Sequence, residues 1–81
     1  MRRLSSLCPG ESADIECILT HKPIRRRLQD IGLIRGEKVT CLQKSFFGDP
    51  TAYLIRNVVV AIRREDADNV LLGQAVDYEE S

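Results

Sequence analysis

The sequence has 81 residues, 43% of them hydrophobic and 30% charged, and its 12 basic and 12 acidic side chains cancel. This composition excludes a disordered tail, and we expect one domain over residues 1–81 that buries about 60% of the surface its unfolded chain exposes. The longest apolar run, Val58 to Ile62, is too short to span a bilayer and the charged start lacks the apolar stretch of a secretory signal, so we expect a cytoplasmic protein without direct membrane insertion.

The first predicted element is a β-strand. Ala13, Ile15, Cys17 and Leu19 alternate with the residues between them at a period of two, which is typical of a half-buried strand. On this pattern we expect the side chain of Cys17 to point into the core.

A short helix is predicted next, from Pro23 to Ile31. Proline suits the first helical position because its missing N–H costs nothing there, and Ile24 and Leu28 begin an apolar face at helical spacing. Gly32 is expected to close the helix as a left-handed cap, with Leu33 folding back onto the last turn. A helix of this length is not stable alone in water, so it must pack on a sheet.

The second half of the chain alternates β-forming segments with turn residues. Gly36 is expected to supply a positive φ, residues 46–50 form a turn, and Asn57 can form the tight turn of a hairpin. Short strands interrupted by one short helix predict a mainly β fold, a small SH3-like β-barrel of about five strands. The later elements expected are the strands Val39–Lys44, Tyr53–Arg56, Val58–Ile62 and Leu71–Val76 and one helical turn at Glu65–Asn69.

Charge is distributed unevenly along this neutral chain. Residues 22–38 include six basic and two acidic residues, whereas residues 65–81 include six acidic residues and no basic one. A domain with a basic side and an acidic end suits contact with one acidic partner better than general nucleic-acid binding.

The cysteines predict neither a disulfide framework nor a zinc ribbon. Cys8, Cys17 and Cys41 are odd in number and widely spaced, which favours reduced thiols that fill the core. Of the Cys and His residues, only Cys17 and His21 are two to five positions apart, and the strand and the loop aim them differently. We therefore expect no tight metal site and no bound cofactor.

No motif of an enzyme is recognisable in the sequence. It lacks a GxxxxGK[ST] phosphate-binding loop, and His21 has no nucleophile in register with it. We therefore expect a protein that is not an enzyme, and any nucleotide chemistry would belong to a partner.

An ordered set of short motifs extends over nearly the whole chain. They are Leu4-x-x-Leu7-x-Pro9-Gly10-Glu11-x-Ala13-x-Ile15, Arg27-Leu28-x-x-x-Gly32-Leu33-x-x-Gly36-x-x-Val39, Gly48-Asp49-Pro50, and Ala61-x-Arg63 with Ala67 and Val70. In this order and over this length the chain resembles the FeoA family, small cytoplasmic proteins of bacterial ferrous iron uptake. The resemblance implies an SH3-like fold, which is also that of the C-terminal domain of some metal-dependent repressors.

The resemblance also implies a role and a partner. FeoA-like proteins are accessory or regulatory partners of FeoB, a membrane protein with a cytoplasmic GTPase domain that moves ferrous iron. We expect this chain to bind the cytoplasmic GTPase region of FeoB. The alternative is an SH3-like nucleic-acid-binding or repressor-like module, which the zero net charge and the acidic C-terminal stretch oppose. Self-association is open to a small barrel whose edge strands can pair.

Three consecutive arginines, Arg25, Arg26 and Arg27, stand near the expected start of the helix, where each cation opposes the helix dipole by about 0.3–1 kcal/mol. Either they contact an acidic partner, together with Arg35, or they are solvated and Asp30 partly neutralises them. We favour partner contact, because an Arg-before-Asp order contributes only a few tenths of a kcal/mol.

Phe46 and Phe47 precede the turn at Gly48. Neighbouring residues on a strand point to opposite faces, so we expect one of the two rings in the core. The other, for which we take Phe47, is a candidate anchor for a partner.

Overall fold

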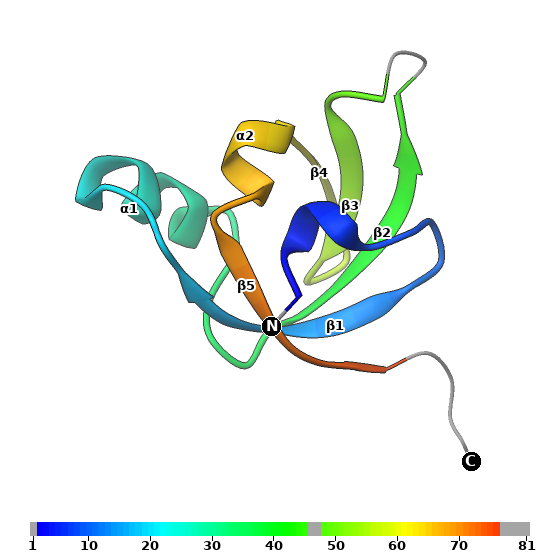
Figure 1. Ribbon diagram of the computed structural model, residues 1–81, viewed down its shortest axis with the longest axis horizontal. Coiled ribbons are helices and arrows are strands. Elements are labelled where there is room, and N and C mark those ends of the chain that lie inside the picture. Colours follow the sequence, from blue (N-terminus) through cyan, green and yellow to red (C-terminus); the bar gives the residue numbers. More distant parts are fainter. Residues whose placement is uncertain (1, 46–47, 77–81) are drawn as a thin grey trace.

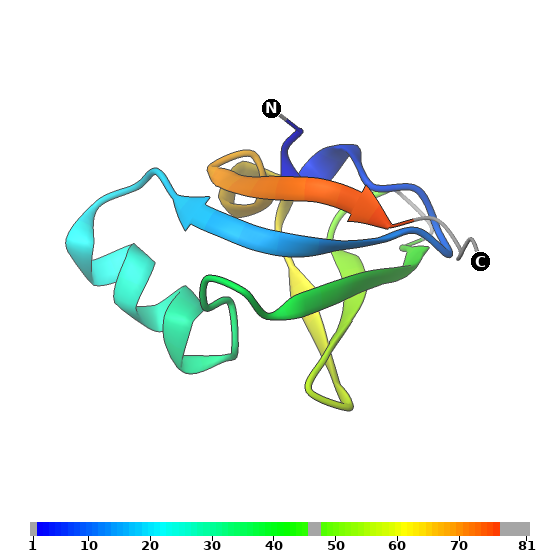
Figure 2. The ribbon, with the colours of Figure 1, turned by 90° about the horizontal axis from the view of Figure 1, so that it is seen from below.

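Five antiparallel strands dominate the computed structural model, which describes residues 2–45 and 48–76 (Figure 1). The elements in chain order are the 3₁₀ helix η1 (Leu4–Ser6), β1 (Ser12–Ile18), α1 (Lys22–Asp30), β2 (Lys38–Lys44), β3 (Thr51–Ile55), β4 (Val58–Ile62), α2 (Arg64–Ala67) and β5 (Val70–Val76). The strands form one sheet in the order β4-β3-β2-β1-β5. β3 and β4 cross the other strands steeply, so the bent sheet wraps around the core (Figure 2). The predicted mainly β barrel with a helix after its first strand is confirmed.

The core consists of aliphatic side chains packed around one tyrosine, Tyr53. Leu4 and Leu7, in and just after η1, are fully buried, although the sequence patterns predicted no element there. A single turn of 3₁₀ helix is too short to show a periodicity, so only packing identifies it. The largest fully buried side chains are those of Tyr53, Leu4, Leu7, Ile15, Leu33, Ile55, Leu72, Val39, Val70 and Cys41.

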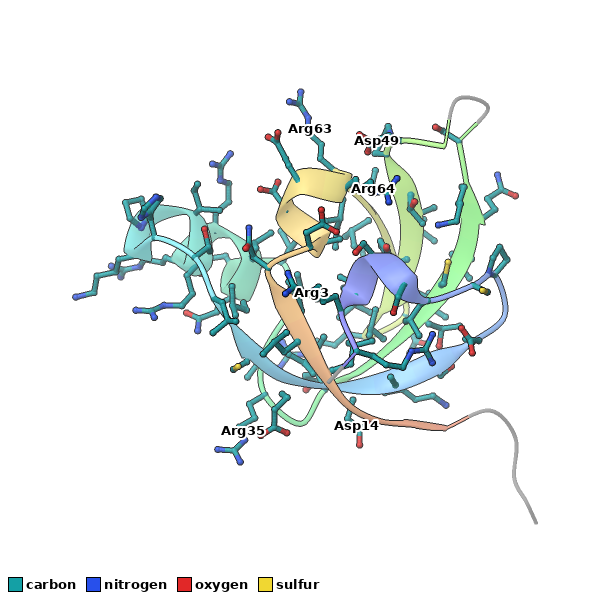
Figure 3. All side chains as sticks on the ribbon, viewed as in Figure 1. Arg3, Asp14, Arg35, Asp49, Arg63 and Arg64 are labelled. Carbon is teal, nitrogen blue, oxygen red and sulfur yellow. The ribbon has the colours of Figure 1, made fainter. Side chains whose placement is uncertain are left out.

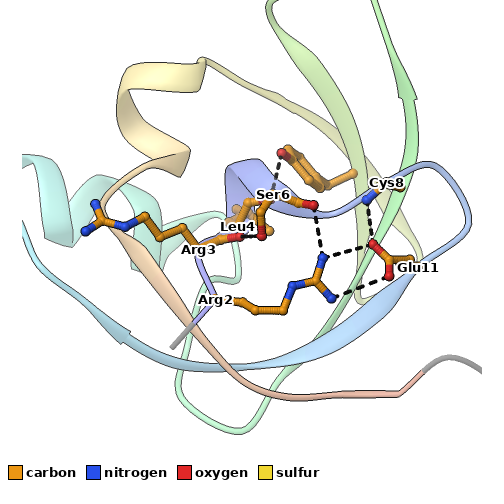
Figure 4. Close-up of polar contacts among 7 residues, drawn as sticks. Arg2, Arg3, Leu4, Ser6, Cys8 and Glu11 are labelled. Atoms are coloured by element: carbon orange, nitrogen blue, oxygen red, sulfur yellow. Dashed lines mark hydrogen bonds and ion pairs between the residues drawn. The ribbon is translucent and has the colours of Figure 1, made fainter.

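The N-terminal segment is tied to the barrel at two places. On β5, the N–H of Leu72 donates to the carbonyl of Arg2 at 2.8 Å, and Arg3 forms an isolated β-bridge with Leu71. Ahead of β1, the guanidinium of Arg2 donates to the carboxylate of Glu11 at 3.0 Å (Figure 4). This hydrogen bond lowers the pKa of Glu11. The segment therefore covers the outer side of β5 at Leu71 and Leu72.

A bulge in β1 reverses the predicted orientation of Cys17. Between Ile15 and Cys17, β1 advances by two residues while its partner β5 advances by one, from Leu72 to Leu71. The extra residue shifts the alternation by one position, so Ile15 and Ile18 are buried and Cys17 is exposed. The prediction that Cys17 points inward was wrong for this reason.

The helix α1 ends in the predicted left-handed glycine cap. Gly32 has a φ of 112°, the N–H of Leu33 donates to the carbonyl of Leu28 at 3.1 Å, and the N–H of Gly32 donates to that of Gln29 at 3.0 Å. These two bonds form a Schellman motif. Leu33 is buried, in agreement with the prediction that it folds back onto the last turn of the helix. A Cβ on Gly32 would lie only 2.7 Å from Cγ2 of Ile55, so the helix end sits directly against β3.

A two-residue turn joins β3 and β4. Arg56 and Asn57 have φ values of 53° and 65°, as a type I′ turn requires, and Ile55 pairs with Val58 across it. The hairpin predicted at Asn57 is confirmed, but Arg56 belongs to the turn rather than to the strand. The predicted helical turn near residue 65 is α2, which begins at Arg64.

Replacing Gly32 by alanine is expected to destabilise the protein more than the same change at Gly36. Both glycines have positive φ, 112° and 91°, so each alanine introduces strain of about 1–2 kcal/mol. At Gly32 the new methyl group also clashes with Ile55, whereas at Gly36 it enters open space. In urea unfolding, Gly32→Ala should lose about 1–3 kcal/mol more than Gly36→Ala. Equal losses would contradict the tight contact of the helix end with β3.

Tyr53 is expected to make stability fall at alkaline pH. Its hydroxyl donates to the carbonyl of Leu4 at 3.3 Å, and burial raises its pKa to about 12. Since tyrosine ionises near pH 10 in the unfolded chain, this contribution is complete below about pH 10 and is lost as pH rises to about 12. Tyr53→Phe should cost about 1 kcal/mol at neutral pH and lose less stability than the wild type above about pH 10. The urea unfolding midpoints of the wild type and of Tyr53→Phe, measured across this pH range, test the prediction. If both midpoints fall by the same amount as pH rises, the prediction is refuted.

Candidate partner-binding site

The helix α1 lies to one side of the barrel, beside the end of β1 (Figures 1 and 2). Leu28 is its buried residue and Ile24 packs against the core. The rest of the helix surface, including Arg26 and Arg27, faces solvent. This amphipathic packing, together with the cap at Gly32, fixes which way the arginines point.

The arginines lie deeper in α1 than the sequence predicted. The helix begins at Lys22, so Arg25 is its fourth residue and Arg27 falls in its last turn. The N–H of Arg25 already donates within the helix, to the carbonyl of His21 at 2.8 Å. The predicted conflict with the helix start therefore holds for Arg25, which lies in the first turn, but not for Arg27, because the dipole favours a cation in the last turn.

Arg25 and Arg35 line one groove between α1 and β1. Arg25 belongs to the helix, whereas Arg35 follows the glycine cap on the loop to β2 and projects to the outside of the barrel (Figure 3). The groove has a volume of about 390 Å³. Its floor is aliphatic and its rim is polar. The lining residues are Ile15, Glu16, Cys17, Ile18, Arg25, Gln29, Leu33 and Arg35. We refer to it as the α1–β1 groove.

A second hollow lies on the other side of Arg25. It has a volume of about 560 Å³ and shares Ile18 and Arg25 with the α1–β1 groove. It also includes the exposed side chain of Leu19 and the imidazole of His21. Arg25 thus stands between two depressions, each of which combines apolar and polar groups.

The positive charge of this surface is only partly neutralised. Arg35 forms an ion pair with Glu16 at 3.3 Å, and this pair is exposed enough to contribute little to stability. In the part of the chain that the structure describes, no ion pair involves Arg25, Arg26 or Arg27, so the neutralisation by Asp30 that was considered as the alternative does not form. Such cations are available to an anionic partner.

Of the predicted site residues, the structure brings Arg25 and Arg35 together in the α1–β1 groove. Arg26 and Arg27 are exposed on α1 and do not line it. Phe47, and Phe46 beside it, lie outside the described residues. Sequence reasoning missed Gln29 and the other lining residues, because their common position depends on where the fold places α1 beside β1.

The three thiols differ in environment. Cys41 is buried, and burial raises its pKa, as suits a small core residue. Cys8 and Cys17 are exposed, so the prediction that they fill the core was wrong.

No group of three or more His, Cys, Asp or Glu side chains that could hold a metal ion occurs within residues 2–45 and 48–76. No helix in that part of the chain is long and apolar enough to cross a membrane.

The sequence matches known proteins over most of its length. The FeoA domain model matches residues 2–72. A stretch of 68 residues is 34% identical to the Fe(2+) transport protein A/Fe(2+) transporter FeoB fusion protein of Porphyromonas gingivalis. This match covers 84% of the chain but only 8% of the fusion protein.

Several solved structures share the fold. The FeoA protein from Chlorobium tepidum is 31% identical with a TM-score of 0.82, over 88% of this chain and 68% of that one. The Stenotrophomonas maltophilia FeoA, solved with zinc and described as a procaryotic SH3 domain protein, is 28% identical with a TM-score of 0.80, over 90% and 91% of the two chains. A manganese-dependent transcriptional repressor, 17% identical, shares the fold alone, with a TM-score of 0.76 over 85% of this chain and 39% of that one.

A five-stranded antiparallel barrel with one helix beside it and a basic groove between the two defines a small SH3-like domain. The chain belongs to the FeoA family, which is associated with ferrous iron transport.

Thiol reactivity tests the environments of the three cysteines. At mildly alkaline pH a thiol reagent is expected to modify Cys8 and Cys17 of the native protein quickly, because both are exposed. Cys41 should react only after unfolding in guanidinium chloride, since it is 0% exposed. Counting modified thiols by mass spectrometry checks this, with Cys17→Ser as the control that removes one fast site. Fast modification of all three would contradict the burial of Cys41.

Proposed function

We propose that this chain is a non-catalytic accessory protein of ferrous iron uptake that binds the cytoplasmic GTPase region of FeoB through the α1–β1 groove. The observation that carries the proposal is that Arg25 and Arg35, from two different elements, line one groove with an aliphatic floor. Arginine is always charged and binds carboxylates through its planar fork, so these residues fit an acidic surface. Arg26 and Arg27 add positive potential beside the groove, and Phe47 stays a predicted anchor.

The relative from Porphyromonas gingivalis supports the choice of partner. As its name states, that protein is a fusion of Fe(2+) transport protein A and the Fe(2+) transporter FeoB. Its similarity to this chain extends over 68 residues. Two units encoded as one chain are held at high effective concentration, which suits partners that act together. In this proposal the chain comprises one domain, residues 1–81, and works in the cytoplasm.

A binding protein of this kind acts on its partner only through different affinities for the partner's states. We therefore propose that the affinity for FeoB depends on the nucleotide that the GTPase region holds. The chain itself binds no cofactor in this proposal, and the nucleotide chemistry belongs to FeoB.

Charge reversal in the groove tests this function. The double variant Arg25→Glu, Arg35→Glu should bind the cytoplasmic region of FeoB at least about tenfold more weakly than the wild type at low salt, and the difference should shrink as salt screens the charges. Isothermal calorimetry across a salt series, with and without guanine nucleotide, measures both effects.

The matched control is the double variant Lys38→Glu, Lys44→Glu, which reverses two exposed charges on β2 outside the groove lining. It should change the affinity less than about twofold, and all variants should keep the melting temperature of the wild type. Equal binding by the wild type and the double variant would contradict the groove assignment. Binding to duplex DNA in place of FeoB would favour the repressor-like alternative.

A further inference from the structure

The two edges of the sheet are treated differently. β5 is one edge, and the N-terminal segment covers it through the bridge of Arg3 with Leu71 and the bond from Leu72 to Arg2. β4 is the other edge. Across residues 2–45 and 48–76, no further strand or bridge pairs with its outer side.

The open edge of β4 presents its own backbone groups. In a two-residue hairpin the pair next to the turn exchanges both hydrogen bonds, and such pairs alternate along the strands. Val58, Val60 and Ile62 therefore bond to β3, and the N–H and C=O groups of Val59 and Ala61 point outward. These groups form a ready template for one more strand.

None of the usual protections against strand addition occurs in β4. Its sequence, Val-Val-Val-Ala-Ile, has no charged residue and no proline, and its register with β3 is free of bulges. Val58 and Val59 are 56% and 62% exposed, and they lie on opposite faces of the strand. β4 is therefore accessible at its edge and on the face of Val59 and Ala61. On the other face only Val58 is exposed, because Val60 packs against the core and Ile62 is buried. The hairpin that contains β4 projects away from the other strands (Figure 2).

An apolar groove of about 300 Å³ adjoins β4 on the side of the helix α1. Val58 and Val60 form one wall, and the end of α1, with the exposed side chain of Ile31, forms the other. A strand added to β4 would place alternate side chains on the face of Val58 and Val60, where this groove can take them.

The charges at the ends of β4 discriminate between possible occupants. Arg56, whose guanidinium forms an exposed ion pair with Glu37 at 3.2 Å, precedes the strand, and Arg63 and Arg64 follow it. Two copies of β4 paired antiparallel about Val60 would bring the turn with Arg56 of each copy toward the end of the other strand, where Arg63 and Arg64 lie, and this approach of like charges is unfavourable. An incoming strand with acidic ends would instead meet cations at both ends.

We propose that β4 accepts an extended segment of another protein as a sixth, antiparallel strand, with apolar side chains at alternate positions and an acidic residue at each end. The surface is separate from the α1–β1 groove, so this proposal does not depend on the proposed function. Main-chain hydrogen bonds to Val59 and Ala61 hold the segment, and the groove beside Ile31 selects its side chains.

A synthetic peptide tests the edge directly. The probe is a blocked seven-residue peptide in which valines alternate with serines between terminal aspartates, added up to about 1 mM. In two-dimensional NMR spectra of the ¹⁵N-labelled protein, the amides of Val59 and Ala61 should shift and exchange more slowly with solvent. Those of Val58 and Val60, already bonded to β3, should change less. No response of the β4 amides up to this concentration would overturn the proposal.

Two sets of controls separate strand addition from simple contact. N-methylation of the peptide amides that face β4 should abolish binding, whereas methylation of the opposite amides should not. Ala61→Pro removes an outward N–H and should weaken binding at least about tenfold, while Ala61→Ser keeps the N–H and should bind like the wild type. A peptide with terminal lysines should bind several-fold more weakly at low salt.

The same experiments also detect two other outcomes, binding without backbone pairing and self-association of this chain. If both methylated peptides bind as well as the parent, backbone pairing does not hold the segment and the proposal fails. If the β4 amides become protected as the protein alone is concentrated, the occupant is a second copy of this chain, which also overturns it.

Discussion

The close approach of Gly32 to Ile55 determines how the helix meets the barrel. Because glycine has no Cβ, the end of α1 can lie against a side chain of β3 that a larger residue would meet at 2.7 Å. The positive φ of Gly32 then turns the chain so that Leu33 enters the core that Leu28 also reaches. Both grooves depend on this contact, since Leu33 lines the α1–β1 groove and Gly32 lines the groove beside β4.

In the proposed function, the α1–β1 groove serves recognition and not catalysis. An arginine keeps its proton throughout the physiological range, so Arg25 and Arg35 serve as permanent cations rather than as proton carriers. The aliphatic floor excludes water from one side of them and strengthens their attraction for an anion. Glu16 pairs with Arg35 at the rim, but the pair is exposed and therefore weak, so Arg35 can still meet an anionic group of a partner.

The edges of the sheet show how a small barrel controls association. The N-terminal segment pairs with β5 at Leu71 and Leu72, and the bulges between β1 and β5 disturb the flat geometry that a further strand would need. β4 keeps a regular register and an apolar surface, and the arginines at its ends oppose pairing with its own copies. Since the groove and the β4 edge lie on different elements, one partner can use both or two partners can use one each.

The sequence alone determined the features that depend on neighbouring residues. The cap at Gly32 and the hairpin turn at Asn57 follow from local φ requirements, and the ordered motifs along the chain identified the FeoA family and its barrel. Only the tertiary structure decided the exposure of Cys17, because the bulge that reverses it depends on the register of β1 with a distant strand, β5. It also decided that Arg25 and Arg35 share a groove, since this depends on the placement of α1 beside β1 and not on the spacing of the two arginines in the sequence.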